Sequence, residues 1–213
     1  MDMSKDRSDI TRLTVLGESL CLDFANTVGW HASSEPQEWI SDYGQLAKWS
    51  VHAGVITEEK KNELLIQSIQ FADEANQVYT EAIELREAIY RIFKDEIYKG
   101  EINREDLAVL NRWIKRSFSY LEIIKPSASY RLSFNGTKEL DQMIWPIVQS
   151  AMDLLTSEDK KRVKQCEGGT CGWLFLDTSR NKSRRWCSME DCGNRAKAKR
   201  HYNRKKHENL TKH

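Results

Sequence analysis

The sequence predicts an α+β fold: a mostly helical N-terminal domain with a few short strands, followed by a small cysteine-rich module that ends in a basic helix. Three observations predict it. Apolar residues recur at helical spacing over much of residues 42–118. Two β-prone runs, 120–124 and 130–134, flank a turn that contains proline and serine, which predicts a hairpin. Four of the five cysteines lie in the last quarter of the chain.

The first elements are short. Residues 13–16 are expected to form a strand that a glycine ends. Residues 20–24 allow two interpretations, because their alternation of apolar and other residues predicts a strand while their four-residue spacing fits a helix about as well. Residues 29–41 are expected to form a loop.

Helices follow, each with its own start or stop signal. Asp42 opens a helix that runs to about residue 53, and Thr57 caps the next one. Residues 74–99 give the strongest helical pattern, which Gly100 ends. Asn103 caps a fourth helix.

The last helix of this domain is expected to run from Thr137 to about residue 155. Pro146 either kinks it or marks its true start, because a proline has no backbone N–H to donate inside a helix. The polar stretch 155–159 is the best boundary in the chain, and it predicts domains at 1–158 and 159–213.

Polar residues within the apolar stretch near residue 20 are candidates for a ligand pocket. Asp23 and Asn26 are expected to be at least half buried, either capping backbone groups or contacting a ligand. Trp30 and His31 are candidates for the wall of the same pocket. Cys21 stands alone among apolar neighbours and is expected to be an inert core thiol.

Charge divides the chain into two unlike parts. Residues 160–213 hold 16 Lys and Arg against 5 Asp and Glu, whereas residues 1–159 hold 17 against 27. An acidic body with a basic tail indicates a polyanionic partner. The polar N-terminus resembles no signal peptide and no apolar run is long enough for a membrane helix, so a cytoplasmic protein without a membrane partner is expected.

The cysteines form two pairs with metal-ligand spacing. Cys166 and Cys171 have four residues between them, as do Cys187 and Cys192, and fifteen residues separate the pairs. Two short loops that each carry two thiolates suit tetrahedral Zn²⁺, and in a reducing compartment metal ligation is favoured over disulfides. A redox disulfide pair and an iron–sulfur cluster are the alternatives.

The residues after Cys192 predict a basic helix that cannot bury a face in its own protein. A phosphate backbone is the simplest partner, and the alternative is solvated charge that offsets the metal–thiolate centre. The candidate nucleic-acid contacts lie in this helix and in the loop between the cysteine pairs: Arg180, Lys182, Arg184, Arg185, Asn194, Arg195, Lys197, Lys199, Arg200 and Arg204.

Two stretches resemble known families. The segment from Cys187 to Arg195, Cys-Ser-Met-Glu-Asp-Cys-Gly-Asn-Arg, resembles the CGNR zinc finger. The segment 17–27, Gly-Glu-Ser-Leu-Cys-Leu-Asp-Phe-Ala-Asn-Thr, is similar to the start of the ABATE domain of stress-induced transcription regulators, although Glu18 stands where a second glycine is expected. The resemblance implies that the four paired cysteines are the zinc ligands and that Asn194 and Arg195 complete the signature.

These observations favour a zinc-dependent transcription regulator whose tail binds nucleic acid, with double-stranded DNA the favoured partner. Asn194 and Arg195 are expected to touch a phosphate or a base edge, and the other basic residues to bind phosphates. The acidic domain is expected to sense an unknown small-molecule effector or to form a homodimer. The alternatives are an RNA- or ribosome-binding protein, a small-molecule-binding protein with an accessory finger, and a redox sensor. No nucleophile motif or phosphate loop is present, so an enzyme is not expected.

Overall fold

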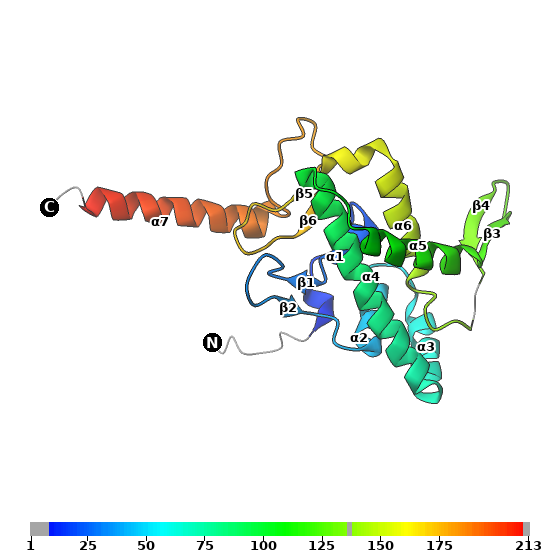
Figure 1. Cartoon of the computed structure of the whole chain (residues 1–213). Helices are drawn as coiled ribbons and strands as arrows, with labels where there is room; N and C mark the ends of the chain where they lie inside the picture. Colours follow the sequence, from blue (N-terminus) through cyan, green and yellow to red (C-terminus); the bar gives the residue numbers. More distant parts are fainter. Residues whose placement is uncertain (1–8, 136–137, 211–213) are drawn as a thin grey trace.

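The computed structural model describes residues 9–135 and 138–210, and it confirms the predicted α+β class, with helices dominating (Figure 1). The helices are α1 (Leu20–Ala25), α2 (Tyr43–His52), α3 (Glu58–Gln70), α4 (Ala72–Tyr98), α5 (Arg104–Phe118), α6 (Trp145–Thr156) and α7 (Asn194–Leu210). Short turns of helix are the 3-10 turns η1 (Ile10–Arg12) and η2 (Glu158–Arg162) and the π-helical turn η3 (Met189–Gly193).

Six short strands form antiparallel pairs in the described part of the chain. The pairs are β1 (Val28–Gly29) with β2 (Gln37–Glu38), β3 (Leu121–Ile124) with β4 (Arg131–Phe134), and β5 (Val163–Gln165) with β6 (Leu174–Leu176). The hairpin predicted over residues 120–134 is confirmed, in the register that pairs Leu121 with Phe134.

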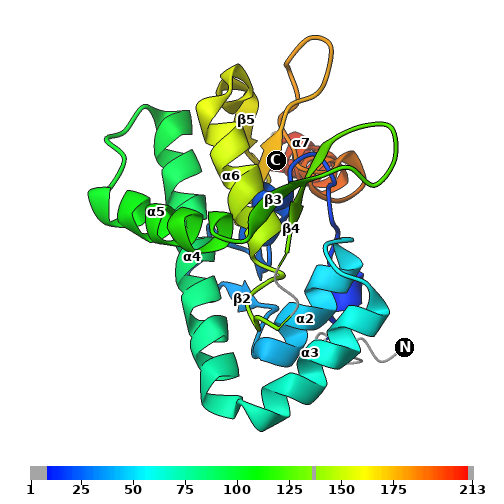
Figure 2. The ribbon, with the colours of Figure 1, turned by 90° about the vertical axis from the view of Figure 1, so that its right-hand side faces the viewer.

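Helix α4 forms the centre of the body. It contacts α1, α2, α3 and α5, and β5 and β6 of the C-terminal part also pack against it (Figures 1 and 2). Its apolar stripe, which includes Val78, Leu85, Ile89 and Phe93, is almost fully buried. Helix α7 projects away from this body and is seen nearly end-on in Figure 2.

The predicted helix starts are confirmed by side chains that accept hydrogen bonds from first-turn N–H groups. Asp42 accepts from Gln45 N at 2.8 Å, and Thr57 accepts from Lys60 N at 3.2 Å. Asn103 caps α5 in the same way. Each cap satisfies a backbone donor that the helix itself leaves without a partner.

Two expectations for the N-terminal stretch are corrected. Residues 13–16 form no strand, because the N–H of Leu16 donates to the carboxylate of Asp23 at 2.8 Å and not to a neighbouring strand. Residues 20–25 form helix α1, so the helical interpretation is confirmed and the strand is wrong. Nearly every residue of α1 is buried between α4 and α6, which blurs the periodicity that would distinguish a helix from a strand.

Smaller differences concern loops and helix ends. The expected loop 29–41 contains strand β2. Helix α4 starts two residues earlier than predicted, and Lys99, with φ of 54°, takes the left-handed position at its end that the sequence assigned to Gly100. Pro146 marks the true start of α6, because turns precede Trp145; the predicted cap, Thr137, lies outside the described residues.

The C-terminal part is joined to the body through a shared core. Val163 of β5 and Leu174 and Leu176 of β6 are buried in the same apolar cluster as the helices of the body. Phe175, on the opposite face of β6, packs with the paired cysteines in a second, smaller cluster. Strand β6 therefore links the two cores. No helix among the described residues is long and apolar enough to span a bilayer.

Candidate metal centre and nucleic-acid interface

The four paired cysteines converge on one point. Their sulfur atoms all lie within 4.8 Å of one another, and all four residues are buried. The Sγ of Cys187 lies 3.8 Å from the Sγ atoms of both Cys171 and Cys192. Four ligands at the Zn–S distance of about 2.3 Å in a regular tetrahedron would lie about 3.8 Å apart. The donor set and its spacing therefore fit a tetrahedral metal ion.

The first cysteine loop is shaped by glycines. A Cβ atom on Gly168 would lie 2.8 Å from the Sγ of Cys192, so only glycine leaves room for the cluster there. Gly169 takes a φ of +72°, a conformation that favours glycine. The N–H of Cys187 lies 3.4 Å from the Sγ of Cys166 and supplies a backbone donor to that sulfur.

The thiols influence one another's ionisation strongly. Hydrogen bonds from the Cys171 and Cys187 thiols lower the pKa of Cys166 to about 2. Donating to that thiolate in turn raises the pKa of Cys171 to about 12, and the pKa of Cys187 is raised in the same way. A divalent cation bound by the four sulfur atoms would favour the thiolate form of each of them.

Arg195 supports the metal centre from the start of α7. Its guanidinium donates to the Sγ of Cys192 at 2.9 Å and lies over the ring of Trp30, 4.7 Å from the centroid. A hydrogen bond to a metal-ligating sulfur neutralises part of its charge and fixes its orientation. The structure therefore places Arg195 against a thiolate and an indole of the body, while its side chain remains exposed to solvent.

Arg184 is also engaged within the fold. Its guanidinium pairs with Glu18, bonds to the carbonyl oxygens of Trp186 and Cys187, and lies 4.6 Å from the centroid of the Phe175 ring. These contacts fix the chain just before the second cysteine pair. Glu18, the departure from the family pattern, is thus an ion-pair partner of the finger.

Asp177 organises the loop between the cysteine pairs, and sequence reasoning missed it. Its fully buried carboxylate accepts from Lys164 Nζ at 2.6 Å, from the N–H of Ser179 and from the N–H of Arg184, each at 3.0 Å. Burial alone would raise the pKa of Asp177, but these bonds hold it below its usual range. The sequence offers one signal for the buried position of Asp177: it directly follows the apolar run Leu174–Leu176.

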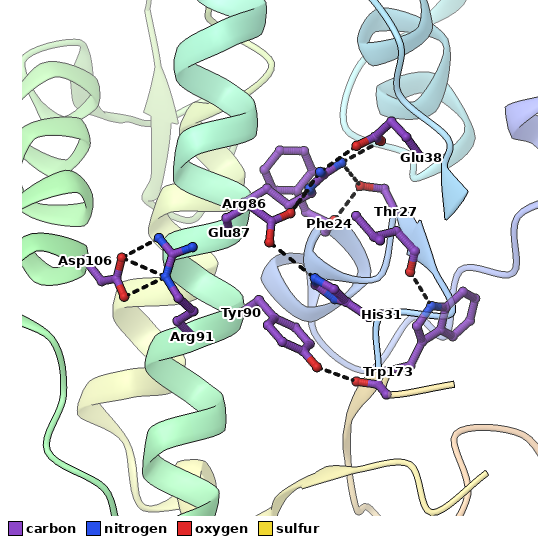
Figure 3. A network of polar contacts seen from close by, with 12 residues as sticks. Phe24, Thr27, His31, Glu38, Arg86, Glu87, Tyr90, Arg91, Asp106 and Trp173 are labelled. Atoms are coloured by element: carbon purple, nitrogen blue, oxygen red, sulfur yellow. Dashed lines mark hydrogen bonds and ion pairs between the residues drawn. The ribbon is translucent and has the colours of Figure 1, made fainter. Parts of the chain in front are cut away.

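A polar network joins the first cysteine loop to α4 (Figure 3). The hydroxyl of Tyr90 donates to the carbonyl of Gly172 at 3.0 Å. The ring of His31 stacks on Tyr90 with centroids 3.6 Å apart, and its Nε2 lies 3.2 Å from Glu87. Burial raises the pKa of Glu87, but His31 and Arg86 outweigh it and lower the value to about 2.

Backbone contacts complete this attachment. The N–H of His31 donates to the carbonyl of Cys171 at 2.9 Å, and a Cβ on Gly172 would lie only 2.7 Å from the backbone nitrogen of Ala32. The body thus holds a metal-ligating residue directly through its main chain. His31 was a candidate from the sequence, whereas its partners Tyr90 and Glu87 occupy ordinary positions of a helical pattern and carry no local signal.

Asn26 and Asp23 serve backbone groups. The side chain of Asn26 donates to the carbonyl of Leu174 at 2.8 Å and accepts from its N–H at 2.9 Å. Asp23 accepts from the N–H groups of Leu16 and Gly17. Both are buried, and burial raises the pKa of Asp23 to about 6. Both side chains therefore cap backbone groups, as one of the two interpretations predicted. Trp30, another of the candidate pocket residues, lines a cavity beside the paired cysteines.

The basic residues of α7 lie on an uncovered helix. None of residues 194–205 is buried apart from partial cover of Ala196, and this stretch holds no Asp or Glu. Lys197, Arg200 and Arg204 line one shallow hollow along its side. Lys199 is exposed as well, while Asn194 uses its side-chain N–H to bond the carbonyl of Glu190.

The remaining candidates lie in the loop between the cysteine pairs. Arg180 and Lys182 are exposed, and Lys182 adopts a left-handed φ of 49°. Arg185 pairs with Glu167 and lies over the ring of Trp186. The loop and α7 together present most of the basic side chains that sequence reasoning selected.

Comparison with protein families gives two matches. The CGNR zinc finger model matches residues 162–205, and the ABATE model, described as "Putative stress-induced transcription regulator", matches residues 18–158. A comparison with curated proteins gives no match. The two models cover the metal centre and the helical body whose geometry is described above. Because the second model spans well over half of the sequence, the chain belongs to the ABATE family, and it carries a CGNR zinc finger at its C-terminal end.

Proposed function

We propose that this protein is a transcription regulator that binds double-stranded DNA through α7 and the loop between its cysteine pairs, with Zn²⁺ as the structural ion. The observation that carries the proposal is α7 itself. It holds six Lys and Arg between residues 194 and 205, no acidic residue in that stretch, and no buried side chain. An isolated helix of this composition is only marginally stable. A negatively charged partner such as a phosphate backbone would stabilise it.

The arrangement of charge suits a phosphate backbone. Lys197, Arg200 and Arg204 recur at the three- and four-residue spacing that places side chains on one helix face, and they share one hollow. The major groove of DNA is wide enough for an α-helix. Arg184 and Arg195 are excluded from the proposed contact set because their guanidinium groups serve the finger.

Zinc is the ion we assign to the centre. Four thiolates with tetrahedral spacing are the donor set of structural zinc sites, and the family model is that of a zinc finger. The four cysteines would hold the ion, and the ion would fix the first turn of α7, which begins two residues after Cys192. Zinc then sets the direction in which the basic helix leaves the body.

The test is binding of labelled duplex DNA by the zinc-loaded full chain over a salt series. About six phosphate contacts predict that log K falls with log salt at a slope near −5. The triple variant K197Q/R200Q/R204Q should reduce that slope by about 3. The matched control is K48Q/K94Q/K115Q, which removes three exposed lysines from the body and should change neither slope nor affinity.

Two outcomes contradict the proposal. An affinity that does not depend on salt would refute the electrostatic contact, and equal losses in the two triple variants would refute its location. Competition with structured RNA under the same conditions distinguishes the nucleic acids: stronger binding of RNA than of duplex DNA would replace DNA by RNA as the partner.

A further inference from the structure

A cavity of about 200 Å³ lies between the helical body and the finger. The body contributes residues 12–14 and the start and end of the loop that joins β1 to β2. The finger contributes three of the four paired cysteines and residues beside them. The lining residues that matter here are Gly29, Trp30, Gln37, Trp39, Trp173 and Arg195. The cavity therefore depends on both parts of the chain, and it lies at the base of α7.

Its walls are suited to a flat ring. Three of the chain's seven tryptophans line this one small space. Trp30 is held there with a left-handed φ of 55°, a conformation that costs a residue other than glycine about 1 kcal/mol or more. Indole faces offer stacking surface to planar ligands. The volume equals roughly seven water molecules, which is room for one ring system and not for a drug-sized molecule.

The cavity has an unused hydrogen-bond donor. The Nε1 of Trp39 is buried and has no partner among the described residues. The equivalent atom of Trp173 donates to the carbonyl of Val28 at 2.9 Å, so it is already satisfied. Gln37 adds an amide that can both donate and accept. A buried N–H without a hydrogen-bond partner destabilises the fold. A ligand with an acceptor atom in its ring would give the Trp39 N–H such a partner.

Charge around the cavity favours a neutral ligand. Arg12 and Arg195 bring two positive charges to the lining. Asp191 brings one negative charge, and four thiolates around a divalent ion carry a net charge of about −2. The net charge is about −1, which disfavours an anionic ligand, and the two guanidinium groups in the wall disfavour a cationic one, so a neutral ligand fits best.

We propose that this cavity binds a neutral, planar nitrogen heterocycle with the chemistry of a nucleobase. The ring packs against the indoles of Trp30 and Trp173 and accepts a hydrogen bond from Trp39 Nε1. Its source is either an unstacked nucleotide of the nucleic acid held by α7 or a free nucleoside. The first source rests on the proposed function, whereas binding of the ring itself does not.

The test uses 2-aminopurine riboside, a fluorescent nucleoside whose emission is quenched when it stacks on an indole. The metal-loaded full chain should quench it saturably, and adenosine should compete. Gly29→Ala would place a Cβ 3.0 Å from Trp39 Nε1 and should weaken binding at least tenfold. Gly100→Ala is the matched control, because its Cβ would meet only ordinary contacts from 3.6 Å and Gly100 does not line the cavity.

Several outcomes overturn the proposal. They are absence of quenching with the wild type, equal quenching with Gly29→Ala at unchanged metal content and thermal midpoint, and competition by benzoate or benzylamine as strong as that by adenosine. Trp39→Phe keeps an aromatic ring and removes the N–H, so it should weaken binding less than Gly29→Ala but measurably.

The source of the ring is decided by a second titration with a single-stranded oligonucleotide that contains 2-aminopurine. If the ring comes from nucleic acid, K197Q/R200Q/R204Q should lose the oligonucleotide and keep the riboside, and if it is a free nucleoside, only the riboside should be quenched. Riboside binding without duplex binding would uphold the cavity and refute the proposed function. Duplex binding with no quenching in either titration would refute the cavity alone.

Discussion

Replacing Asn26 by alanine should destabilise the attachment of the finger to the body. The side chain of Asn26 is 1% exposed and makes two hydrogen bonds, of 2.8 and 2.9 Å, with the backbone of Leu174 in β6. The N–H and carbonyl of Leu174 face away from β5. The side-chain amide of Asn26 therefore makes the two hydrogen bonds that a second neighbouring strand would otherwise make. Alanine leaves a buried N–H and a buried carbonyl without partners, at about 1–3 kcal/mol each. We expect the free energy of unfolding to fall by about 2–6 kcal/mol.

The assay is urea unfolding of the metal-loaded protein, followed by tryptophan fluorescence. Asn76→Ala is the matched control, because Asn76 is exposed on α4 and its loss should change the free energy by less than about 0.5 kcal/mol. A loss below about 1 kcal/mol for Asn26→Ala, or equal losses in both variants, would refute the reasoning that Asn26 replaces a strand.

Three further predictions concern the finger and the network behind it. Asp177→Asn should speed removal of the metal by a chelator several-fold, because it loosens the loop between the cysteine pairs, whereas exposed Asp153→Asn should not. The pKa of Glu87 is lowered to about 2, so its stabilisation is complete above pH 4.5 and is lost as the pH falls toward 2; Glu87→Gln should flatten that limb of a stability–pH curve, and an unchanged limb would contradict it. Cys187→Ser should abolish stoichiometric metal binding and lower the thermal midpoint, whereas Cys21→Ser, outside the cluster, should retain the metal.

Local signals were sufficient for much of the helical body. The caps Asp42, Thr57 and Asn103 act on N–H groups two or three residues away, so the sequence contains both partners of each bond. The apolar stripe of α4 also belongs to a single segment. Helix α1 could not be assigned in this way, because it is surrounded by other helices and has no polar face to reveal its period.

The same contrast holds within the site. The spacing of the four cysteines predicted the cluster, since each loop brings two thiols together over four residues, and the charge of the last helix predicted that it stays uncovered. The roles of single polar residues did not follow from spacing. The contacts of Arg195 with Cys192 and with Trp30, the latter 165 positions earlier in the chain, were not predicted.

The sequence by itself therefore determined the metal-ligand set, the basic helix and the starts of three body helices, because these depend on residues close together in the chain. Only the tertiary structure decided that Asn26 completes β6, that Arg184 and Arg195 serve the finger, and that a tryptophan-lined cavity forms where the finger meets the body. The bonds of Asn26 with Leu174, the pairing of Arg184 with Glu18, the contact of Arg195 with Trp30 and the walls of the cavity all join segments more than a hundred residues apart. A buried polar group takes whichever partner the packed chain brings within hydrogen-bond distance, and no local pattern records that choice.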